Sequence, residues 1–550
     1  MRGQSHILTV SVEEYYHAGA LQGAVRRKHW DRFESRLERS IDELLALLEK
    51  NGNHATFFVL GCIADHQPEL IQKIASRGHE IAASGYWPSG LRGVLREQFK
   101  EDLRRSRDAL ESAGGVRVVG YRAPREWLTR DDLWVLDVLA EEGFLYDSSI
   151  NPVLHRFKTG AAPFDVGWRA HSGGRGGVWE FPITTVGLFG WRMAVSGGNY
   201  MRQLPHSILK RVVGHLDRTR EKPLVFYVMP WEIDRDQPHV TSVGAMTRVR
   251  LYRNLGKTRW ILEDYFDRYR FQSIASYLAV PASAPIRHDR AVAAAAVSPV
   301  AASATGPVQA VSLVVPLFNE EKNVGYLYRT LVEFRQQLSS GFHVHVVLVD
   351  DGSGDRTWEE LEQRFRDFPD CTLVQHPHNR GVAAAMLTGI GRAPTEIVAT
   401  IDADCSYDPH DLSAMIPLIA DADIVSASPY HPDGRVLNVP GWRLLLSKTL
   451  SRMYGVVLGS RLYTYTACCR IYRKSAIEGL TISDGGFLGI AQILIEAKLR
   501  GARIVEFPAT LESRLFGESK MKILRTIGGH LGLMKDLVVR RARSGGKTKG

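Results

Sequence analysis

The sequence predicts an α/β protein of two domains joined by a linker. Two observations predict this fold class. Short β-branched runs of strand length alternate with helix-like segments in residues 311–404, and the same alternation occurs in residues 1–280. Strands that alternate with helices favour βαβ units and a mostly parallel sheet. The chain has 550 residues, which is enough for two or three domains that each bury a core.

Composition divides the chain into three parts. Residues 1–280 repeat strand-helix units, as in ATFFVLG, HEIAASGY and PLVFYVMP, which predicts an (α/β) barrel-like fold. Residues 281–308 are rich in Ala, Pro and Ser, which is typical of a linker, with a short helix through AVAAAAV as the alternative. Residues 309–550 predict a Rossmann-like, mostly parallel sheet, followed by a basic tail, RRARSGGKTKG, that we expect to be disordered.

The overall composition excludes a disordered chain, because 44% of the residues are hydrophobic and 24% are charged. The net charge of +10 suits nucleotide diphosphates or an anionic membrane surface. The five cysteines are odd in number and have no zinc-site spacing, which favours a reducing cytoplasm. We expect no nucleic-acid partner.

From its residue pattern, we expect no signal peptide and no membrane-spanning helix. The first residues, MRGQSHILTVSVEEYY, lack a basic-then-apolar signal peptide, and no run approaches the roughly 18 apolar residues of a membrane-spanning helix. We therefore expect a cytoplasmic protein that meets the inner face of the membrane from the side.

Acidic and turn-forming residues follow three predicted strands of the second domain. Ligands bind beyond the carboxyl ends of parallel strands, so these side chains are candidate ligand contacts. Two carboxylates at positions i and i+2 after an extended strand can reach one cation, and hard oxygen ligands suit Mg²⁺ or Mn²⁺. A single DxD pattern is weak evidence, whereas three acid-ended strands in order are stronger. The residues are Asn319, Glu320, Asp350, Asp351, Asp402 and Asp404.

Four phrases of the second domain, VVPLFNEE, VDDGSGDRT, DADCSYDP and RLFGESKMK, resemble the inverting family-two glycosyltransferases of GT-A fold. The nearest branch is similar to the dolichyl- or polyprenyl-phosphate mannose synthases, and the resemblance covers residues 311–539. It implies a GDP- or UDP-linked sugar as donor. It also implies a polyprenyl-phosphate or glycan acceptor.

The resemblance also implies roles for single residues. Glu320 and Asp351 would contact the base and ribose, within a donor site that includes Asn319 and Asp350. Asp402 and Asp404 would hold the metal and the diphosphate and so carry the catalysis. The residues that would close over the phosphates are Arg514, Ser519 and Lys520.

The acceptor half departs from the family pattern. Thr464 stands where members often have Asp, and Gln492 stands where they often have an acid. Arg470 and Arg473 match basic positions of the family and could hold an acceptor phosphate, although an ordinary basic helix start is the alternative. Asp408 precedes a proline, which predicts a structural helix N-cap.

Two segments combine leucines with basic residues. They are NVPGWRLLLSKTLSRMYGVVLGSRL, residues 438–462, and IGGHLGLMKDLVVRRAR, residues 527–543. Basic amphipathic helices fit docking at a membrane interface. Helices that pack against the sheet explain the same pattern equally well.

The first domain resembles polysaccharide deacetylases of the NodB type, in the branch associated with exopolysaccharide export. The phrases that carry the resemblance are ATFFVLGCIADHQPELIQKIASRGHEIA, YRAP, YDSSINP, WEFP, GGNYMR and PWEID. Enzymes of this family activate water on a metal held by one Asp and two His, with an acid-base pair beside it.

Four of the family's functional positions carry other residues. Ser11 replaces the leading Asp, Ser84 and Pro88 replace the two histidine ligands, and Met229 replaces the catalytic His. Serine is a poor zinc ligand, proline offers no donor atom and methionine cannot carry a proton. The sequence therefore predicts a degenerate site without zinc. The polar residues that remain near it are Glu13, Glu14, His17 and Arg122.

Three functional hypotheses follow. The favoured one is a glycosyltransferase with a deacetylase-like domain that has lost its chemistry. The second is an enzyme with both activities on one glycan pathway. The third is a scaffold or glycan-binding protein in which neither site turns over. The sequence leaves open the sugar, the nucleotide base, the acceptor and the oligomeric state.

Overall fold

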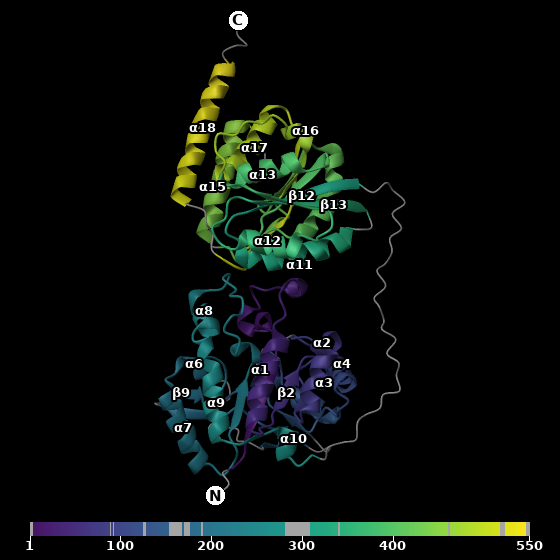
Figure 1. Ribbon diagram of the computed structural model, residues 1–550, viewed down its shortest axis with the longest axis vertical. Coiled ribbons are helices and arrows are strands. Elements are labelled where there is room, and N and C mark those ends of the chain that lie inside the picture. The colour runs from purple at the N-terminus through teal and green to yellow at the C-terminus, as the bar shows by residue number, and fades with distance from the viewer. Residues whose placement is uncertain are drawn as a thin grey trace. The chain divides into compact units, whose positions relative to one another are not determined.

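The computed structural model forms two compact units (Figure 1). The first comprises residues 1–22, 35–237 and 245–295, and the second comprises 23–34, 238–244 and 296–550. The predicted linker, 281–308, lies outside the described residues. The structure describes residues 4–88, 90–91, 93–124, 128–152, 168–169, 177–188, 191–280, 309–338, 341–439, 441–459, 462–517 and 523–545.

A mostly parallel sheet forms the first unit, in the order β10-β1-β2-β3-β4-β5-β7-β6, with β11 beside β1. Each neighbouring pair is parallel except β6 with β7. This half-barrel sheet confirms the predicted α/β fold. The strands are β1 (His6–Val12), β2 (Thr56–Val59), β3 (Glu80–Ala83), β4 (Gly120–Tyr121), β5 (Tyr146–Asp147), β6 (Trp168–Arg169), β7 (Trp179–Glu180), β10 (Val225–Val228) and β11 (Phe271–Gln272).

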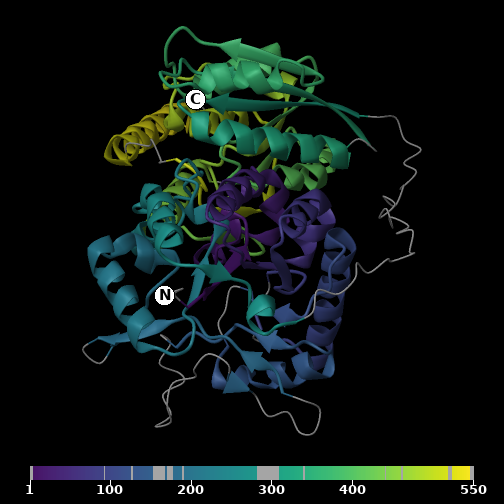
Figure 2. The same cartoon turned by 60° about the horizontal axis from the view of Figure 1, so that its bottom comes forward.

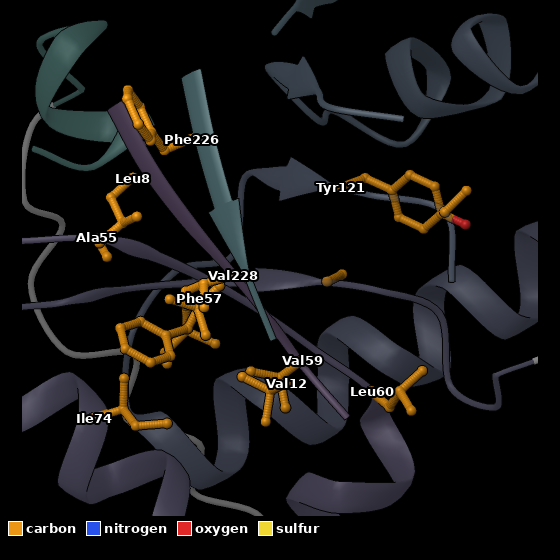
Figure 3. Close-up of a cluster of buried hydrophobic side chains, with 14 of the residues drawn as sticks. Leu8, Val12, Ala55, Phe57, Val59, Leu60, Ile74, Tyr121, Phe226 and Val228 are labelled. Carbon is orange, nitrogen blue, oxygen red and sulfur yellow. The ribbon is translucent and has the colours of Figure 1, made fainter. Parts of the chain in front are cut away.

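Helices cover the sheet, and their apolar stripes make the core. Helix α1 (Leu37–Lys50) buries Ile41, Leu44, Leu45 and Leu48, which lie on one face by helical spacing. Figure 3 shows another part of the same cluster, with buried side chains from β1, β2 and β10. Further helices are α2 (Gly61–His66), α3 (Pro68–Ser76), α4 (Arg96–Gly114), α5 (Trp134–Glu141), α6 (Gly198–Gln203), α7 (His206–Thr219), α8 (Ala245–Tyr252), α9 (Thr258–Arg268) and α10 (Ile274–Tyr277); a hairpin joins β8 (Thr185–Leu188) to β9 (Trp191–Ala194).

The second unit contains a mixed, mostly parallel sheet in the order β14-β13-β12-β15-β18-β16-β19. Only β18 runs antiparallel to its neighbours. The three strands predicted from the sequence are β12, β13 and β15, so this part of the prediction is confirmed. The strands are β12 (Gln309–Leu317), β13 (Phe342–Asp350), β14 (Cys371–Gln375), β15 (Ile397–Thr400), β16 (Ile424–Ser428), β18 (Arg470–Arg473) and β19 (Ile504–Pro508), and a separate pair joins β17 (Arg435–Leu437) to β20 (Thr510–Glu512).

Helices pack on both faces of this sheet (Figures 1 and 2). One core joins β12 to α11 (Glu321–Leu338) and α12 (Thr357–Phe365). A second core, on the opposite face, joins β12 and β13 to α13 (Val382–Arg392) and α17 (Phe487–Leu499). The chain runs outward from β12 through β13 to β14 and then returns to the other side of β12 as β15. The reversal between β12 and β15 is a topological switch point, where open α/β sheets bind ligands.

The remaining helices of the second unit are α14 (Leu412–Met415), α15 (Gly441–Leu458), α16 (Lys474–Ile477) and α18 (Ile523–Gly545). Helix α18 includes the first residues of the tail that we expected to be disordered, so that expectation was wrong up to Gly545. Within the described part of the chain, no helix has the length and apolar character needed to cross a membrane.

Close packing of α13 on the sheet gives a test of this fold. A Cβ on Gly389 would lie 2.3 Å from Val314 Cγ1, whereas a Cβ on Gly391 of the same helix meets nothing within 4 Å. Gly389→Ala should therefore destabilise the protein by about 1–3 kcal/mol through overpacking. Gly391→Ala should stabilise it by up to about 1 kcal/mol through helix propensity. Urea unfolding of both variants measures the difference, and equal stabilities would contradict the packing.

Candidate functional site

The carboxyl ends of β12 and β15 bring charged side chains together. Glu320 follows β12, Asp402 and Asp404 follow β15, and Arg514 follows β20. The Arg514 guanidinium lies 2.6 Å from Glu320 Oε1, and its Nε lies 3.1 Å from Asp404 Oδ2. Residues far apart in the sequence thus meet at the switch point of the sheet, as predicted for parallel strand ends.

Local hydrogen bonds fix the loop after β15. Asp404 Oδ1 accepts from the backbone N–H of Ser406 at 2.9 Å and from its hydroxyl at 2.5 Å. The second oxygen of Asp404 faces Arg514. This carboxylate is held in one orientation before any ligand binds.

Asp402 stands out electrostatically. Burial raises the pKa of this carboxyl, and the nearby charge of Asp404 raises it further, to about 7. For Arg514, burial lowers the pKa, but the charges of Asp404 and Glu320 outweigh burial and raise it. The cluster therefore holds more negative charge than Arg514 alone neutralises.

These residues fit a divalent cation. In the described chain, no three His, Cys, Asp or Glu side chains form a ready-made metal site, so Asp402 and Asp404 would act as a pair. Mg²⁺ and similar ions are commonly held by one or two carboxylates together with substrate phosphates. Burial first, and the like charge of Asp404 second, raise the pKa of Asp402, and a bound cation would favour its ionised form against both.

The acids after β13 have protein partners. Asp350 is fully buried, accepts from Ser353 and lies 3.2 Å from Gln375 Nε2. Asp351 accepts from His376 Nδ1 at 2.7 Å and from the backbone N–H of Arg380 and Gly381. Their described partners hold the turn and the loop at residues 376–381. A direct ligand contact by either carboxylate stays a prediction.

Asn319 joins two strand ends. Its backbone has a positive φ of 52°, and its N–H donates to Ser353 Oγ at 2.8 Å. Its side-chain Oδ1 accepts from the N–H of Gly354 at 2.7 Å. Asn319 thus braces the turn after β13 against the end of β12.

The structure corrects the expectation for Arg470. This residue lies within β18, is fully buried and donates to the carbonyls of Tyr465 and Ile490 at 2.6 and 2.8 Å. This guanidinium would have to give up both buried hydrogen bonds to reach an acceptor phosphate. Arg473 donates to the carbonyls of Ile419 and Ala422, so it also holds the fold.

The two residues that depart from the family pattern on the acceptor side, Thr464 and Gln492, are buried. Thr464 Oγ1 lies 2.8 Å from Ser428 Oγ. Gln492 lies in α17, where its amide donates to Ser483 Oγ at 2.6 Å and accepts from the backbone of Asp484. Both side chains brace loops in this structure.

Two further predictions have different outcomes. Asp408 caps the short 3₁₀ helix Pro409–Asp411, since its side chain accepts from the N–H of His410, and this confirms its structural role. Ser519 and Lys520 lie outside the described residues.

Sequence reasoning missed the partners of Asp408, which include Lys28 and Arg32. The phrase RKHWDR looks like any basic surface stretch and carries no signal of this contact.

In the first unit, a buried arginine occupies the predicted deacetylase-like site. Arg122 Nη1 lies 3.2 Å from Ser11 Oγ, and its Nη2 donates to Thr9 and Ser148. The hydroxyl of Ser84 donates to the carbonyl of Arg122 at 2.9 Å. Burial lowers the pKa of Arg122 to about 10. The structure thus brings two of the four substituted positions together around one cation.

The other two positions lie at neighbouring strand ends. Pro88 is buried in the loop after β3. Met229 follows β10 and packs beside Ile183 and Tyr227. Glu14 follows β1, and burial raises its pKa to about 7 even though Ser35 donates to it.

Three family models match the chain. Glycosyl transferase family 2 matches residues 312–481, Polysaccharide deacetylase matches 30–139, and a Domain of unknown function (DUF3473) matches 148–279. These matches confirm both resemblances found in the sequence.

Known proteins match the second half. A dolichol-phosphate mannosyltransferase from Pyrococcus furiosus is 29% identical over 38% of this chain, which spans 59% of that protein. A polyprenol monophosphomannose synthase from Mycolicibacterium smegmatis is 31% identical over 39% of this chain and 82% of its own length. A solved mannosyltransferase from Pyrobaculum calidifontis, in complex with GDP-Man and Mn²⁺, is 19% identical with a TM-score of 0.30, covering 42% of this chain and 64% of its own.

The raised pKa of Asp402 predicts a pH effect on stability. The ion-free folded protein keeps this proton up to about pH 7, whereas an unfolded Asp loses it near pH 4. The folded state therefore holds more protons between these values, and its stability should fall as pH rises through this window. Asp402→Asn cannot ionise and should lack this part of the fall.

Thermal unfolding between pH 4 and pH 8, with a chelator present, measures this effect. In separate samples without chelator, Mn²⁺ at pH 8 should raise the thermal unfolding midpoint of the wild type. It should raise the midpoint of Asp402→Asn much less. Identical pH profiles for the two proteins would rule out the raised pKa.

Proposed function

The chain belongs to the glycosyl transferase family 2, and from that membership we propose that it transfers a sugar from a nucleotide-sugar donor, with inversion, to a polyprenyl-phosphate or glycan acceptor. The product would enter cell-surface polysaccharide or glycolipid synthesis. The observation that carries the proposal is the meeting of Glu320, Asp404 and Arg514 beside Asp402 at the sheet's switch point. Named relatives act on dolichol or polyprenol phosphates, which motivates the acceptor class.

In the proposed donor site, positive charges would stabilise the leaving diphosphate. A divalent cation bound at Asp402 and Asp404 would neutralise the leaving diphosphate. Arg514 adds a second positive charge at the same edge, and Glu320 holds its guanidinium in place. The Ser406 hydrogen bonds keep Asp404 oriented, so little reorganisation is needed when the donor enters.

The acceptor half needs little base catalysis if the acceptor is a phosphate. A phosphate is already ionised at neutral pH, whereas an alcohol must lose a proton. Thr464 and Gln492 stand where family members often have acids, and neither can serve as a base. This favours the polyprenyl-phosphate acceptor over a glycan hydroxyl.

Donor binding gives the direct test. Nucleotide-sugar binding should require Mg²⁺ or Mn²⁺, and Asp404→Ala should remove that requirement and abolish transfer, through loss of several kcal/mol of leaving-group stabilisation. Titration calorimetry with GDP- and UDP-sugars measures binding. The matched control is Asp421→Asn, an exposed acid that precedes β16 at the other end of a strand. Equal nucleotide affinity with metal or with chelator would refute the site.

We propose that the protein works in the cytoplasm, at the inner face of the membrane, and the exposed side chains of α15 and α18 support the membrane contact. Leu445 and Val456 of α15 are 69% and 81% exposed, and α15 also exposes Lys448 and Arg452. Helix α18 packs on α15 through the Tyr454 hydroxyl and His530, at 2.8 Å, and adds exposed apolar side chains of its own. Apolar and basic side chains together suit an anionic lipid surface. The side chain of Arg443 lies outside the described set.

Liposome co-sedimentation tests this contact. The protein should bind anionic vesicles at low ionic strength, and binding should weaken as salt is added. Leu445→Glu with Val456→Glu should reduce binding strongly. The control is Leu418→Glu, an exposed leucine outside both helices. No binding at low ionic strength, or equal binding of control and double variant, would reject the surface.

For the first unit we propose loss of deacetylase activity. The residues at the base, ligand and acid positions are Ser11, Ser84, Pro88 and Met229, and both serines are hydrogen-bonded to Arg122. A site with neither of its two imidazoles should not retain zinc at micromolar concentration. Without metal, water keeps its ordinary high pKa and does not attack an amide at neutral pH.

Metal analysis and acetate release test this proposal. In an Asp404→Ala background, which removes the second site, the chain should hold no stoichiometric zinc. It should release no acetate from N-acetylated oligosaccharides. Introducing Ser11→Asp, Ser84→His, Pro88→His and Met229→His together should recover zinc before activity, since ligand geometry returns more easily than a productive substrate pose. One tightly held zinc with acetate release in the starting protein would favour the two-activity hypothesis instead.

A further inference from the structure

Two short segments from early in the sequence are part of the second unit. Residues 23–34 and 238–244 group with residues 296–550 in this compact unit. Both lie outside residues 312–481, which match glycosyl transferase family 2. Both contact loops that carry residues of the proposed donor site.

The first contact involves Arg32, whose side chain is 3% exposed. Its Nη2 lies 3.1 Å from Asp408 Oδ1 and 2.7 Å from His410 Nδ1. Its Nε donates to Glu333 of α11 at 2.8 Å. Asp408 ends the loop that begins with Asp402 and Asp404. Arg32 therefore ties this loop to α11.

Further partners of Asp408 come from the same segment. Lys28 Nζ lies 2.6 Å from Asp408 Oδ2, and His29 Nε2 lies 3.5 Å from it. A buried carboxylate is costly unless it is paired and hydrogen-bonded. The conformation of the loop after β15 thus depends on partners that residues 23–34 supply.

Aromatic packing extends this contact to the Arg514 loop. The ring of Phe33 meets the rings of Tyr326 and Phe516 edge-on, with centroids 5.4 and 5.7 Å apart. Phe516 lies two residues after Arg514. One short segment therefore contacts both loops that carry the charged cluster.

The second segment holds the Arg514 loop by its backbone. The N–H of Thr241 donates to the carbonyl of Leu515 at 2.7 Å. The Thr241 hydroxyl donates to the carbonyl of Gly517 at 2.8 Å. These bonds fix the backbone directly after Arg514.

We propose that residues 23–34 and 238–244 position the two loops of the donor site, with Arg32 and Thr241 as positioning residues for sugar transfer. The hydrogen bonds given above for Arg32 and Thr241 go to the two loops, so each residue would act through the loop that it holds. The proposal rests on the proposed function, since it assigns these residues to the same donor site. It implies that the transferase machinery extends beyond the part of the chain that resembles its family.

Calorimetry of the full chain with Mn²⁺ and either GDP or UDP tests this proposal. Arg32→Met keeps the aliphatic stem but removes the charge, and Thr241→Val keeps the shape but removes the hydroxyl. Arg32→Met removes the cation that ties Asp408 to Glu333, and Thr241→Val removes the hydroxyl bond to the Gly517 carbonyl. Each change should weaken nucleotide binding by about tenfold. The Mn²⁺ concentration at half-saturation should rise as well. Arg32→Lys should restore part of the affinity, because a cation returns.

Matched controls separate positioning from general damage. Arg36→Met removes a neighbouring arginine that pairs with Asp234 in the first unit. Thr219→Val removes a hydroxyl that donates to a carbonyl within α7. Both should keep the wild-type nucleotide and Mn²⁺ affinities. Thermal midpoints of all variants show whether an affinity change goes with unfolding.

Each outcome decides one of the claims. If the wild type shows no Mn²⁺-dependent binding, the proposed function fails, and the positioning role falls with it. If the wild type binds and Thr241→Val binds like Thr219→Val, the positioning role alone is overturned. Should Arg32→Met fail to fold, Thr241→Val still decides, because it is isosteric.

Discussion

Charge balance at the carboxyl ends of β12 and β15 is the constraint on which the second unit depends. Glu320, Asp402 and Asp404 converge there, and close carboxylates in a partly buried place are costly unless they are compensated. Arg514 compensates two of them, and the pKa of Asp402 rises to about 7. The fold therefore tolerates an excess of negative charge at one edge, and a bound dication would offset it.

The first unit buries a positive charge instead of an excess of negative charge. Arg122 is a buried cation, and Ser11, which we predict to stand in place of a family carboxylate, lies beside it. Hydroxyls of Thr9, Ser11 and Ser148 accept from the guanidinium, and its centre lies 4.3 Å from the Phe58 ring centroid. These contacts satisfy the guanidinium without an ion. Arg122 thus lies in a packed interior with hydrogen-bond partners for its guanidinium.

The sequence predicted those parts of the structure that depend on neighbouring residues in the chain. Hydrophobic periodicity and turn residues predicted β12, β13, β15 and the helices between them, because these signals arise from neighbours in the chain. The expectation for Arg470 was wrong because a motif position does not show that β18 enters the sheet between β15 and β16. The pairing of Arg32 with Asp408 was also beyond prediction, since it joins residues 376 positions apart and Arg32 stands in no recognisable pattern.

The two segments that contact the donor-site loops depend on the chain on either side of them. A loop that positions a site must itself be held at both ends, because a free peptide loses its order to conformational entropy. Residues 23–34 and 238–244 are each flanked on both sides by residues of the first unit. If these segments position the donor site, the first unit is needed as their folded support, whatever its own chemistry.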